Sequence, residues 1–363
     1  MARVSNIIRE DARWIVDRMG PGLAPLSGKT FVVTGAAGFL CSVLVDTLAE
    51  LNTRLERPCK VIAVDNYQSA VPDRLEHLKD RKDIVLVQHD VSKPFDAKEP
   101  VHYVLHGASV ASPTFYRKYP LETIDVNVQG TRQFLELART HSEVESVVFM
   151  STSEIYGDPT PDMIPTQEDY RGFVSCTGPR ACYDESKRLG ETLCSTYYRL
   201  YKTPVKVIRP FNMYGPGQRL DDKRIMPDLM SAALSKKPLV LLSDGRATRA
   251  LCYVRDAIWG MLHVTVSKAD GEAFNVGNDE QELSMLDVAQ RLSKVAAKVM
   301  NGPELEVKYE KSEDPHYLSD NPQRRCPNLA KLRGLAGHAP WSPQVMLNEG
   351  LERTLRSYLE TAS

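Results

Sequence analysis

Two side chains that could remove a proton from an alcohol stand four residues apart near the middle of the chain. Tyr183 and Lys187 are separated by about one helical turn, so on a helix both would lie on one face. A lysine ammonium beside a tyrosine hydroxyl favours the phenolate, which would let Tyr183 act as a base near neutral pH. We therefore expect a helix around Tyr183 that carries the base for oxidising a carbinol.

A glycine-containing turn near the N-terminus could bind the hydride acceptor that such a base requires. Gly35 and Gly38 follow a short apolar run and precede a helical pattern, a setting in which the backbone approaches a pyrophosphate. We predict that Gly35, Gly38, Phe39 and Leu40 contact a dinucleotide, with an ordinary strand-to-helix turn as the alternative. The usual third glycine is replaced by Cys41, from which we expect a slight shift of the helix and not loss of the site.

The second predicted strand ends in an acidic residue that favours NAD as the cofactor. The carboxylate of Asp65 could accept hydrogen bonds from the adenosine ribose hydroxyls, and it would repel the 2′-phosphate of NADP. Asn66 beside it, and Asp90 and Val91 after the third strand, are predicted to flank the adenosine. A simple turn residue at the end of the strand is the alternative interpretation of Asp65.

Polar residues follow the fifth predicted strand in the segment STSEIYG, 151–157. The carboxyl end of a central parallel strand is where open α/β sheets bind ligands. Thr152 could hydrogen-bond a sugar hydroxyl, and Glu154 could handle a second proton. A capping and turn cluster is the alternative, but Tyr183 and Lys187 some thirty residues later favour a chemical role.

Strand patterns alternate with helical patterns over the first two thirds of the chain, which predicts a doubly wound parallel sheet of the Rossmann type. The strands are near-continuous apolar runs, as expected for strands buried on both faces. After residue 212 the pattern loosens into a smaller, interleaved C-terminal part. The predicted strands are 29–35, 61–66, 83–91, 102–109, 144–154 and 205–212, and the predicted helices include 3–19, 39–52, 121–140, 224–236, 284–300 and 344–358.

The composition is that of an ordinary globular protein. The 363 residues carry a net charge of −1, so nothing indicates binding to nucleic acid or to an anionic membrane surface. No apolar run approaches the roughly 18 residues that would span a bilayer, and the N-terminus does not read as a signal peptide. Seven scattered cysteines without a CxxC pair indicate free thiols in the cytoplasm and no metal site.

Several of these motifs together resemble the extended short-chain dehydrogenase/reductase superfamily, from about residue 28 to the C-terminus. The glycine turn, STSEIYG, the Tyr183–Lys187 pair and RPFNMYGPG (209–217) carry this resemblance. Within the superfamily the resemblance is closest to UDP-glucuronate decarboxylase, also called UDP-xylose synthase. The segments that carry it are ASPTFY (111–116), STSEIYGDP (151–159), GPRACYDESKR (178–188) and ATRALCYVRD (247–256).

The resemblance implies NAD-dependent decarboxylation of UDP-glucuronate to UDP-xylose through a 4-keto intermediate, with NAD regenerated and no metal required. It makes Tyr183 the base and Lys187 its partner, with both also contacting NAD, and it places Thr152 and Glu154 on the sugar. Arg249 matches an arginine near the sugar carboxylate or the diphosphate. The implied substrate-binding residues are Ser112, Pro113, Arg180, Asn212, Arg224 and Arg249.

The resemblance also implies a homodimer and three segments of different role. We expect an N-terminal helical extension at 1–26 and an NAD-binding Rossmann domain at 27–208 and 247–277. A nucleotide-sugar-binding domain is expected at 209–246 and 278–363. Cys41, the N-terminal helix and the segment 166–180 depart from the family pattern.

Three other functions remain open. A nucleotide-sugar 4,6-dehydratase shares the oxidation step, but many such enzymes carry Asp-Glu where this chain has Ser153 and Glu154, and serine is a poor acid. A 4-epimerase shares the same first step. A sugar-nucleotide-binding module without turnover is a third possibility, supported by Cys41 alone and opposed by the intact set of Thr152, Glu154, Tyr183 and Lys187.

Overall fold

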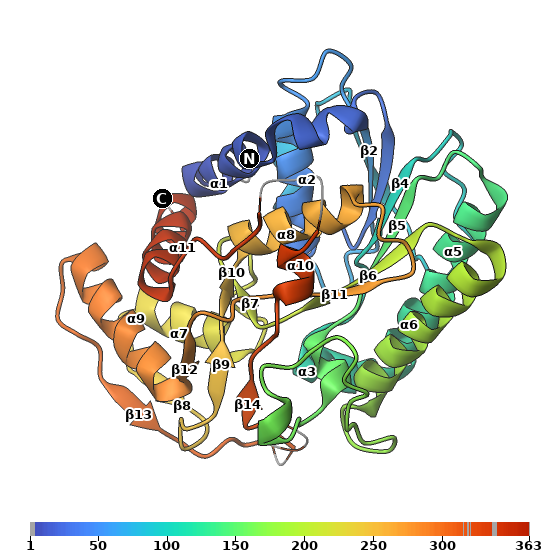
Figure 1. Ribbon diagram of the computed structural model, residues 1–363. Coiled ribbons are helices and arrows are strands. Elements are labelled where there is room, and N and C mark those ends of the chain that lie inside the picture. Colours follow the sequence, from blue (N-terminus) through green and yellow to red (C-terminus); the bar gives the residue numbers. More distant parts are fainter. Residues whose placement is uncertain (1–3, 315, 318, 320, 336–339, 363) are drawn as a thin grey trace.

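A seven-stranded sheet forms the centre of the protein in the computed structural model, which describes residues 4–314, 316–317, 319, 321–335 and 340–362 (Figure 1). The strand order is β11-β6-β5-β4-β1-β2-β3, and every pairing is parallel. Successive strands extend the sheet in opposite directions from β1 and β4, which creates a crevice at their carboxyl ends. The strands are β1 Thr30–Thr34, β2 Lys60–Asp65, β3 Ile84–Gln88, β4 Tyr103–His106, β5 Ser146–Met150, β6 Val205–Pro210 and β11 Ala273–Val276.

Helices cover both faces of this sheet and enclose two hydrophobic cores. Phe31 and Val33 of β1 belong to one core, whereas Val32 between them belongs to the other, as the two-residue repeat of a strand requires. The first face is covered by α2 (Phe39–Leu51) and α8 (Val254–Val266), and the second by α5 (Thr131–Thr140) and α6 (Ala181–Tyr201) (Figure 1). This confirms the predicted Rossmann-type α/β fold.

A smaller part of the chain, built from short strands and the helices α7, α9, α10 and α11, lies beside the carboxyl ends of the central strands. Its sheets are β10–β7, β12–β9–β14 and β13–β8. The strand β9, which carries Arg249, pairs with β12 and β14. The elements are β7 Met213–Tyr214, α7 Ile225–Leu234, β8 Leu239–Leu241, β9 Thr248–Ala250, β10 Cys252–Tyr253, β12 Glu282–Ser284, α9 Met285–Met300, β13 Val307–Tyr309, β14 Arg324–Arg325, α10 Ala330–Arg333 and α11 Leu347–Ala362.

The N-terminal helix α1 (Asn6–Met19) packs against α2, α8 and α11, so the two ends of the chain lie side by side (Figure 1). A 3₁₀ segment, Gly20–Leu26, then leads into β1. No helix in the described part of the chain combines the length and the apolar character that crossing a bilayer requires.

The structure differs from the sequence-based expectation at three points. The strand β11 was not predicted, because Asn275 interrupts the short apolar run. The Asn275 side chain accepts a hydrogen bond from the Tyr156 hydroxyl and donates one to the Thr166 carbonyl. The helix α8 and the short α3 (Pro113–Lys118) were also missed. The helix predicted at 121–140 is divided into α4 (Pro120–Asp125), a π-helical turn (Val126–Gly130) and α5. The proposed domain boundaries stay a prediction.

Candidate active site

The sequence-predicted site residues line two cavities at the crevice. The larger, of about 430 Å³, takes its wall from the carboxyl ends of β1, β4, β5 and β6 and from the smaller part. Gly35, Gly38, Phe39 and Leu40 line it together with every predicted catalytic and substrate-binding residue: Ser112, Pro113, Thr152, Glu154, Arg180, Tyr183, Lys187, Asn212, Arg224 and Arg249. The smaller, of about 230 Å³, is lined by Asp65, Asn66, Asp90 and Val91 and again by Gly35 and Gly38.

The glycine turn after β1 is shaped for a close approach of backbone and ligand. Gly35 has a φ of +65°, and a Cβ there would lie 2.8 Å from the backbone of Ala108. Gly38 is the N-cap of α2, so no side chain caps the helix, and the first turn holds no acidic residue. The amide groups of that turn therefore suit a diphosphate.

Asp65 fixes this turn as well as lining the smaller cavity. One carboxylate oxygen accepts the amide hydrogen of Ala37 at 2.9 Å, and the other accepts that of Tyr67 at 2.7 Å. Burial raises the pKa of Asp65, and these backbone hydrogen bonds oppose the rise. Each oxygen has a further lone pair that could accept a ribose hydroxyl.

Cys41 of α2 is accommodated by Gly107, which directly follows β4. A Cβ at Gly107 would lie 2.3 Å from the Cys41 sulfur and 2.8 Å from the Met150 sulfur, so the thiol occupies space that Gly107 leaves open. Burial raises the pKa of Cys41 to about 12, which keeps the thiol protonated and apolar. The sequence did not reveal this compensation, because Cys41 and Gly107 are far apart in the chain.

The helix α6 brings Tyr183 and Lys187 to the cavity floor, as predicted. Both are buried, with exposed fractions of 6% and 2%. The Lys187 ammonium donates to the Met150 carbonyl at 2.7 Å. The ring of Tyr183 stacks on that of Tyr116, with centroids 5.1 Å apart and planes 8° apart. Packing therefore holds the tyrosine ring in one orientation.

Burial acts against the charged forms of both Tyr183 and Lys187, and their roles as base and partner stay a prediction. Burial raises the pKa of Tyr183 to about 12, although a hydrogen bond with Thr152 opposes the rise. Burial also lowers the pKa of Lys187 to about 7. Desolvation therefore disfavours the charged form of each group.

Glu154 is the centre of an ionic cluster next to this pair. It lies in the 3₁₀ turn Ser153–Tyr156, where the Thr152 hydroxyl accepts its amide hydrogen at 3.2 Å. Arg325 donates to both carboxylate oxygens at 2.6 Å, and Arg180 donates to one of them. Burial alone would raise the pKa of Glu154, but the charges of Arg180 and then Arg325 lower it to about 2. Glu154 is therefore an anion that organises two arginines.

Arg249 adds a third guanidinium to the cluster. It is 9% exposed, and it donates to the carbonyls of Thr248 at 2.7 Å and Pro322 at 2.8 Å. These partners are uncharged, and burial followed by repulsion from Arg325 lowers its pKa to about 9.

Three guanidinium groups lie near three carboxylates in the cluster. These are Glu154, Asp184, which lies 3.7 Å from Arg180, and Asp158, whose charge acts on Arg249. Among the described residues Arg249 hydrogen-bonds to carbonyl oxygens and to no carboxylate, so its guanidinium suits an anionic ligand.

Two residues of the cavity were not identified from the sequence. Arg325 follows Arg324 in an otherwise irregular segment, and only the arginine pair could have signalled it. Tyr116 is the last residue of the segment ASPTFY (111–116); its hydroxyl is buried and has no hydrogen-bond partner among the described residues.

Of the predicted substrate residues, Ser112 donates to the Asp222 carbonyl at 2.6 Å and Arg224 pairs with the Asp222 carboxylate, so both already have protein partners.

The comparison with known proteins agrees with this geometry. The model of the NAD dependent epimerase/dehydratase family matches residues 31–277. The chain belongs to this family. NAD is the cofactor of the family, and the residues present fit it: the glycine turn would hold the diphosphate, and Asp65 would hold the adenosine ribose.

Individual relatives share most of their length with this chain. UDP-glucuronic acid decarboxylase 6 of Arabidopsis thaliana is 35% identical over 325 residues, which cover 90% of this chain and 87% of that protein. The solved epimerase Mth375 of Methanothermobacter thermautotrophicus has a TM-score of 0.77 at 27% identity, over 98% and 96% of the two chains. UDP-glucuronic acid 4-epimerase of Bacillus cereus, solved with UDP-glucuronic acid and NAD, has a TM-score of 0.76 at 25% identity, over 91% and 99%.

The contact between Cys41 and Gly107 predicts coupled effects on stability. Gly107→Ala should lower the free energy of unfolding by about 1–3 kcal/mol, because its methyl group overlaps the Cys41 sulfur. Cys41→Ala in the same protein should restore part of that loss, and urea unfolding of the two single variants and the double variant measures it. Additive losses would contradict the contact.

The buried amine of Lys187 predicts a pH-dependent stability. Its pKa falls from the ordinary 10.5 to about 7 on folding, so between these values the unfolded chain binds a proton that the folded chain does not. The free energy of unfolding of the wild type should therefore rise from pH 7 to pH 10, relative to Lys187→Met, by roughly 2–4 kcal/mol.

Urea unfolding of both proteins at several pH values measures this difference. Lys298→Met, which removes an amine on the exposed face of α9, is the matched control and should follow the wild type. If the free energy of unfolding changes with pH in the same way for the wild type and Lys187→Met, the amine of Lys187 is solvated in the folded protein and the prediction is wrong.

Proposed function

We propose that this protein converts UDP-glucuronate to UDP-xylose and carbon dioxide, with NAD reduced and then reoxidised in the same turnover. The observation that carries the proposal is the arginine cluster beside Tyr183, which suits a carboxylate on the sugar. The 35% identity to a plant protein named UDP-glucuronic acid decarboxylase supports the same substrate.

The first step needs a base, and the cavity floor supplies one. Tyr183 would accept the proton of the sugar 4-hydroxyl, which Thr152 would orient through its own hydroxyl. Lys187 would stabilise the Tyr183 phenolate through the positive charge of its ammonium group. When bound, NAD supplies the hydride acceptor for this step, and its reduced form supplies the donor that returns the hydride.

The second step needs little from the protein, because a 4-keto uronic acid is a β-keto acid. The C5–C6 bond breaks, carbon dioxide leaves, and the electron pair enters the C4 carbonyl to form an enolate. The guanidinium groups of Arg249 and Arg325 would hold the carboxylate in place for this step.

The C5 carbon must then gain a proton. Arg249, through a water molecule, and Glu154 are the two candidate sources of this proton. The geometry favours Arg249 acting on a water molecule, because the arginine neighbours hold the pKa of Glu154 near 2 and leave it without a proton to give. Glu154 is then assigned the role of holding Arg180 and Arg325 in position.

A 4-epimerase is the second candidate, because the same arginines could bind a uronic acid that keeps its carboxylate. The likeness to the Bacillus cereus UDP-glucuronic acid 4-epimerase favours this candidate. A 4,6-dehydratase is disfavoured, because Ser153 and not an acid lies next to Glu154 in the cavity. A binding module without turnover is disfavoured by the buried Tyr183–Lys187 pair.

We also infer a homodimer and a cytoplasmic location. Leu121 and Ile124 of α4 and Leu189 of α6 are exposed apolar side chains on two helices that pack against each other, which suits a subunit contact. The molar mass in solution tests this, and a monomer at micromolar concentration would contradict it. All seven cysteines are free, which supports a reducing compartment.

Incubation with UDP-glucuronate and NAD should release carbon dioxide and form UDP-xylose. Tyr183→Phe should lower the turnover number by at least about 100-fold, because it removes the base, while UDP-glucuronate still binds. Tyr201→Phe, an exposed position on the same helix, is the matched control and should keep full turnover. Carbon dioxide capture and chromatography of the nucleotides measure both products.

The other outcomes of this assay separate the candidates. UDP-galacturonate without carbon dioxide would identify a 4-epimerase. Binding of UDP-glucuronate and NAD with no product from the wild type would identify a binding module.

A further inference from the structure

An acidic residue occupies the apolar face of the N-terminal helix. The buried residues of α1 recur at helical spacing, and Asp11 is one of them, with an exposed fraction of 1%. A carboxylate on such a face costs stability unless it is paired and hydrogen-bonded. The neighbours of Asp11 on this face are Ile7, Ile8, Ala12, Ile15, Val16 and Met19.

Both oxygens of Asp11 are used, and by different elements. The Tyr253 hydroxyl, from β10, donates to one oxygen at 2.7 Å, and Arg353, from α11, donates to the other at 2.8 Å. Arg255 of α8 lies 3.9 Å from the same carboxylate and 4.2 Å from the ring centroid of Trp14 on α1. One side chain thereby ties α1 to β10, α11 and α8.

The strand β10 connects this contact to the wall of the larger cavity. The Cys252 amide donates to the Asn212 carbonyl at 3.2 Å, and Tyr253 pairs with Tyr214 of β7. Asn212 has a φ of +44°, which costs energy for a residue with a side chain, and it lines the cavity. The pairing with β10 therefore holds Asn212 in a strained conformation at the cavity wall.

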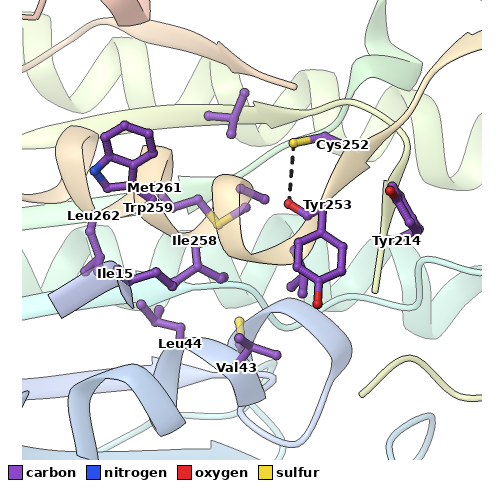
Figure 2. Close-up of a cluster of buried hydrophobic side chains, with 14 of the residues drawn as sticks. Ile15, Val43, Leu44, Tyr214, Cys252, Tyr253, Ile258, Trp259, Met261 and Leu262 are labelled. Atoms are coloured by element: carbon purple, nitrogen blue, oxygen red, sulfur yellow. Dashed lines mark hydrogen bonds between the residues drawn. The ribbon is translucent and has the colours of Figure 1, made fainter. Parts of the chain in front are cut away.

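The side chain of Tyr253 is enclosed by the elements that it joins. Figure 2 shows it in one apolar cluster with Ile15 of α1, Val43 of α2 and Ile258 of α8. Its exposed fraction is 0%. The hydrogen bond to Asp11 therefore fixes the hydroxyl end of Tyr253, and its loss, from either partner, would leave β10 less firmly held against α1.

We propose that Asp11 is a positioning residue for nucleotide-sugar binding, which acts through Tyr253 and β10 on Asn212. This inference rests on the proposed nucleotide-sugar substrate. The helix α1 precedes the segment 31–277 that the family model matches.

The test compares the binding of two ligands by full-length variants. Asp11→Asn should raise the dissociation constant of UDP-glucuronate about five- to tenfold, because an amide is a weaker acceptor for the Tyr253 hydroxyl than a carboxylate. The dissociation constant of NAD should stay within about twofold, since the glycine turn is held by the Asp65 carboxylate and the Val64 carbonyl of β2. Tyr253→Phe should raise the dissociation constant of UDP-glucuronate by the same factor, and the double variant should raise it no further.

Glu10→Gln is the matched control. Glu10 is adjacent to Asp11 and also contacts Arg353, at 3.3 Å, but its side chain is 58% exposed, so its loss should leave both ligands unaffected. If Asp11→Asn does not fold, Tyr253→Phe carries the test, because it keeps the buried ring. Unchanged UDP-glucuronate binding in the folded variants, or equal weakening of both ligands, would overturn the inference.

The proposed function can fail separately from this inference. Dissociation constants do not require turnover, so a wild type that binds UDP-glucuronate without decarboxylating it still permits the comparison. If the variants of such a protein bind UDP-glucuronate more weakly and NAD equally well, the role of Asp11 is supported and only the proposed decarboxylation is wrong.

Discussion

The ion pairs of Glu154 with Arg180 and Arg325 are the constraint on which the site depends. They join three segments that are distant in sequence: the turn after β5, the start of α6 and the strand β14. Because buried charges are stable only when paired, the carboxylate fixes where both guanidinium groups lie. The larger cavity thereby gains a positively charged wall within the same pocket as Tyr183, which is the arrangement that a sugar carboxylate needs.

Burial governs the rest of the chemistry. It raises the pKa of Tyr183 and lowers that of Lys187, so it disfavours the charged form of each group. Packing also explains how Cys41 fits into the glycine turn. Its sulfur fills the space that a side chain at position 107 would occupy, so the turn keeps its place.

Local patterns predicted much of this structure, and long-range contacts could not be predicted. The spacing of Tyr183 and Lys187 and the glycine turn lie within single elements, so periodicity was enough to place them. Arg325 meets Glu154 across 171 residues, and no local signal reports such a contact. The raised pKa of Tyr183 was missed for the same reason, because it depends on burial by segments remote in sequence.

The most direct measurement of the central claim is a crystal structure of Tyr183→Phe, in which turnover is blocked, with NAD and UDP-glucuronate bound. The account predicts the sugar carboxylate within hydrogen-bond distance of Arg249 or Arg325, and the 4-hydroxyl facing the ring of residue 183. A sugar carboxylate directed to solvent, or a 4-hydroxyl remote from that ring, would contradict it.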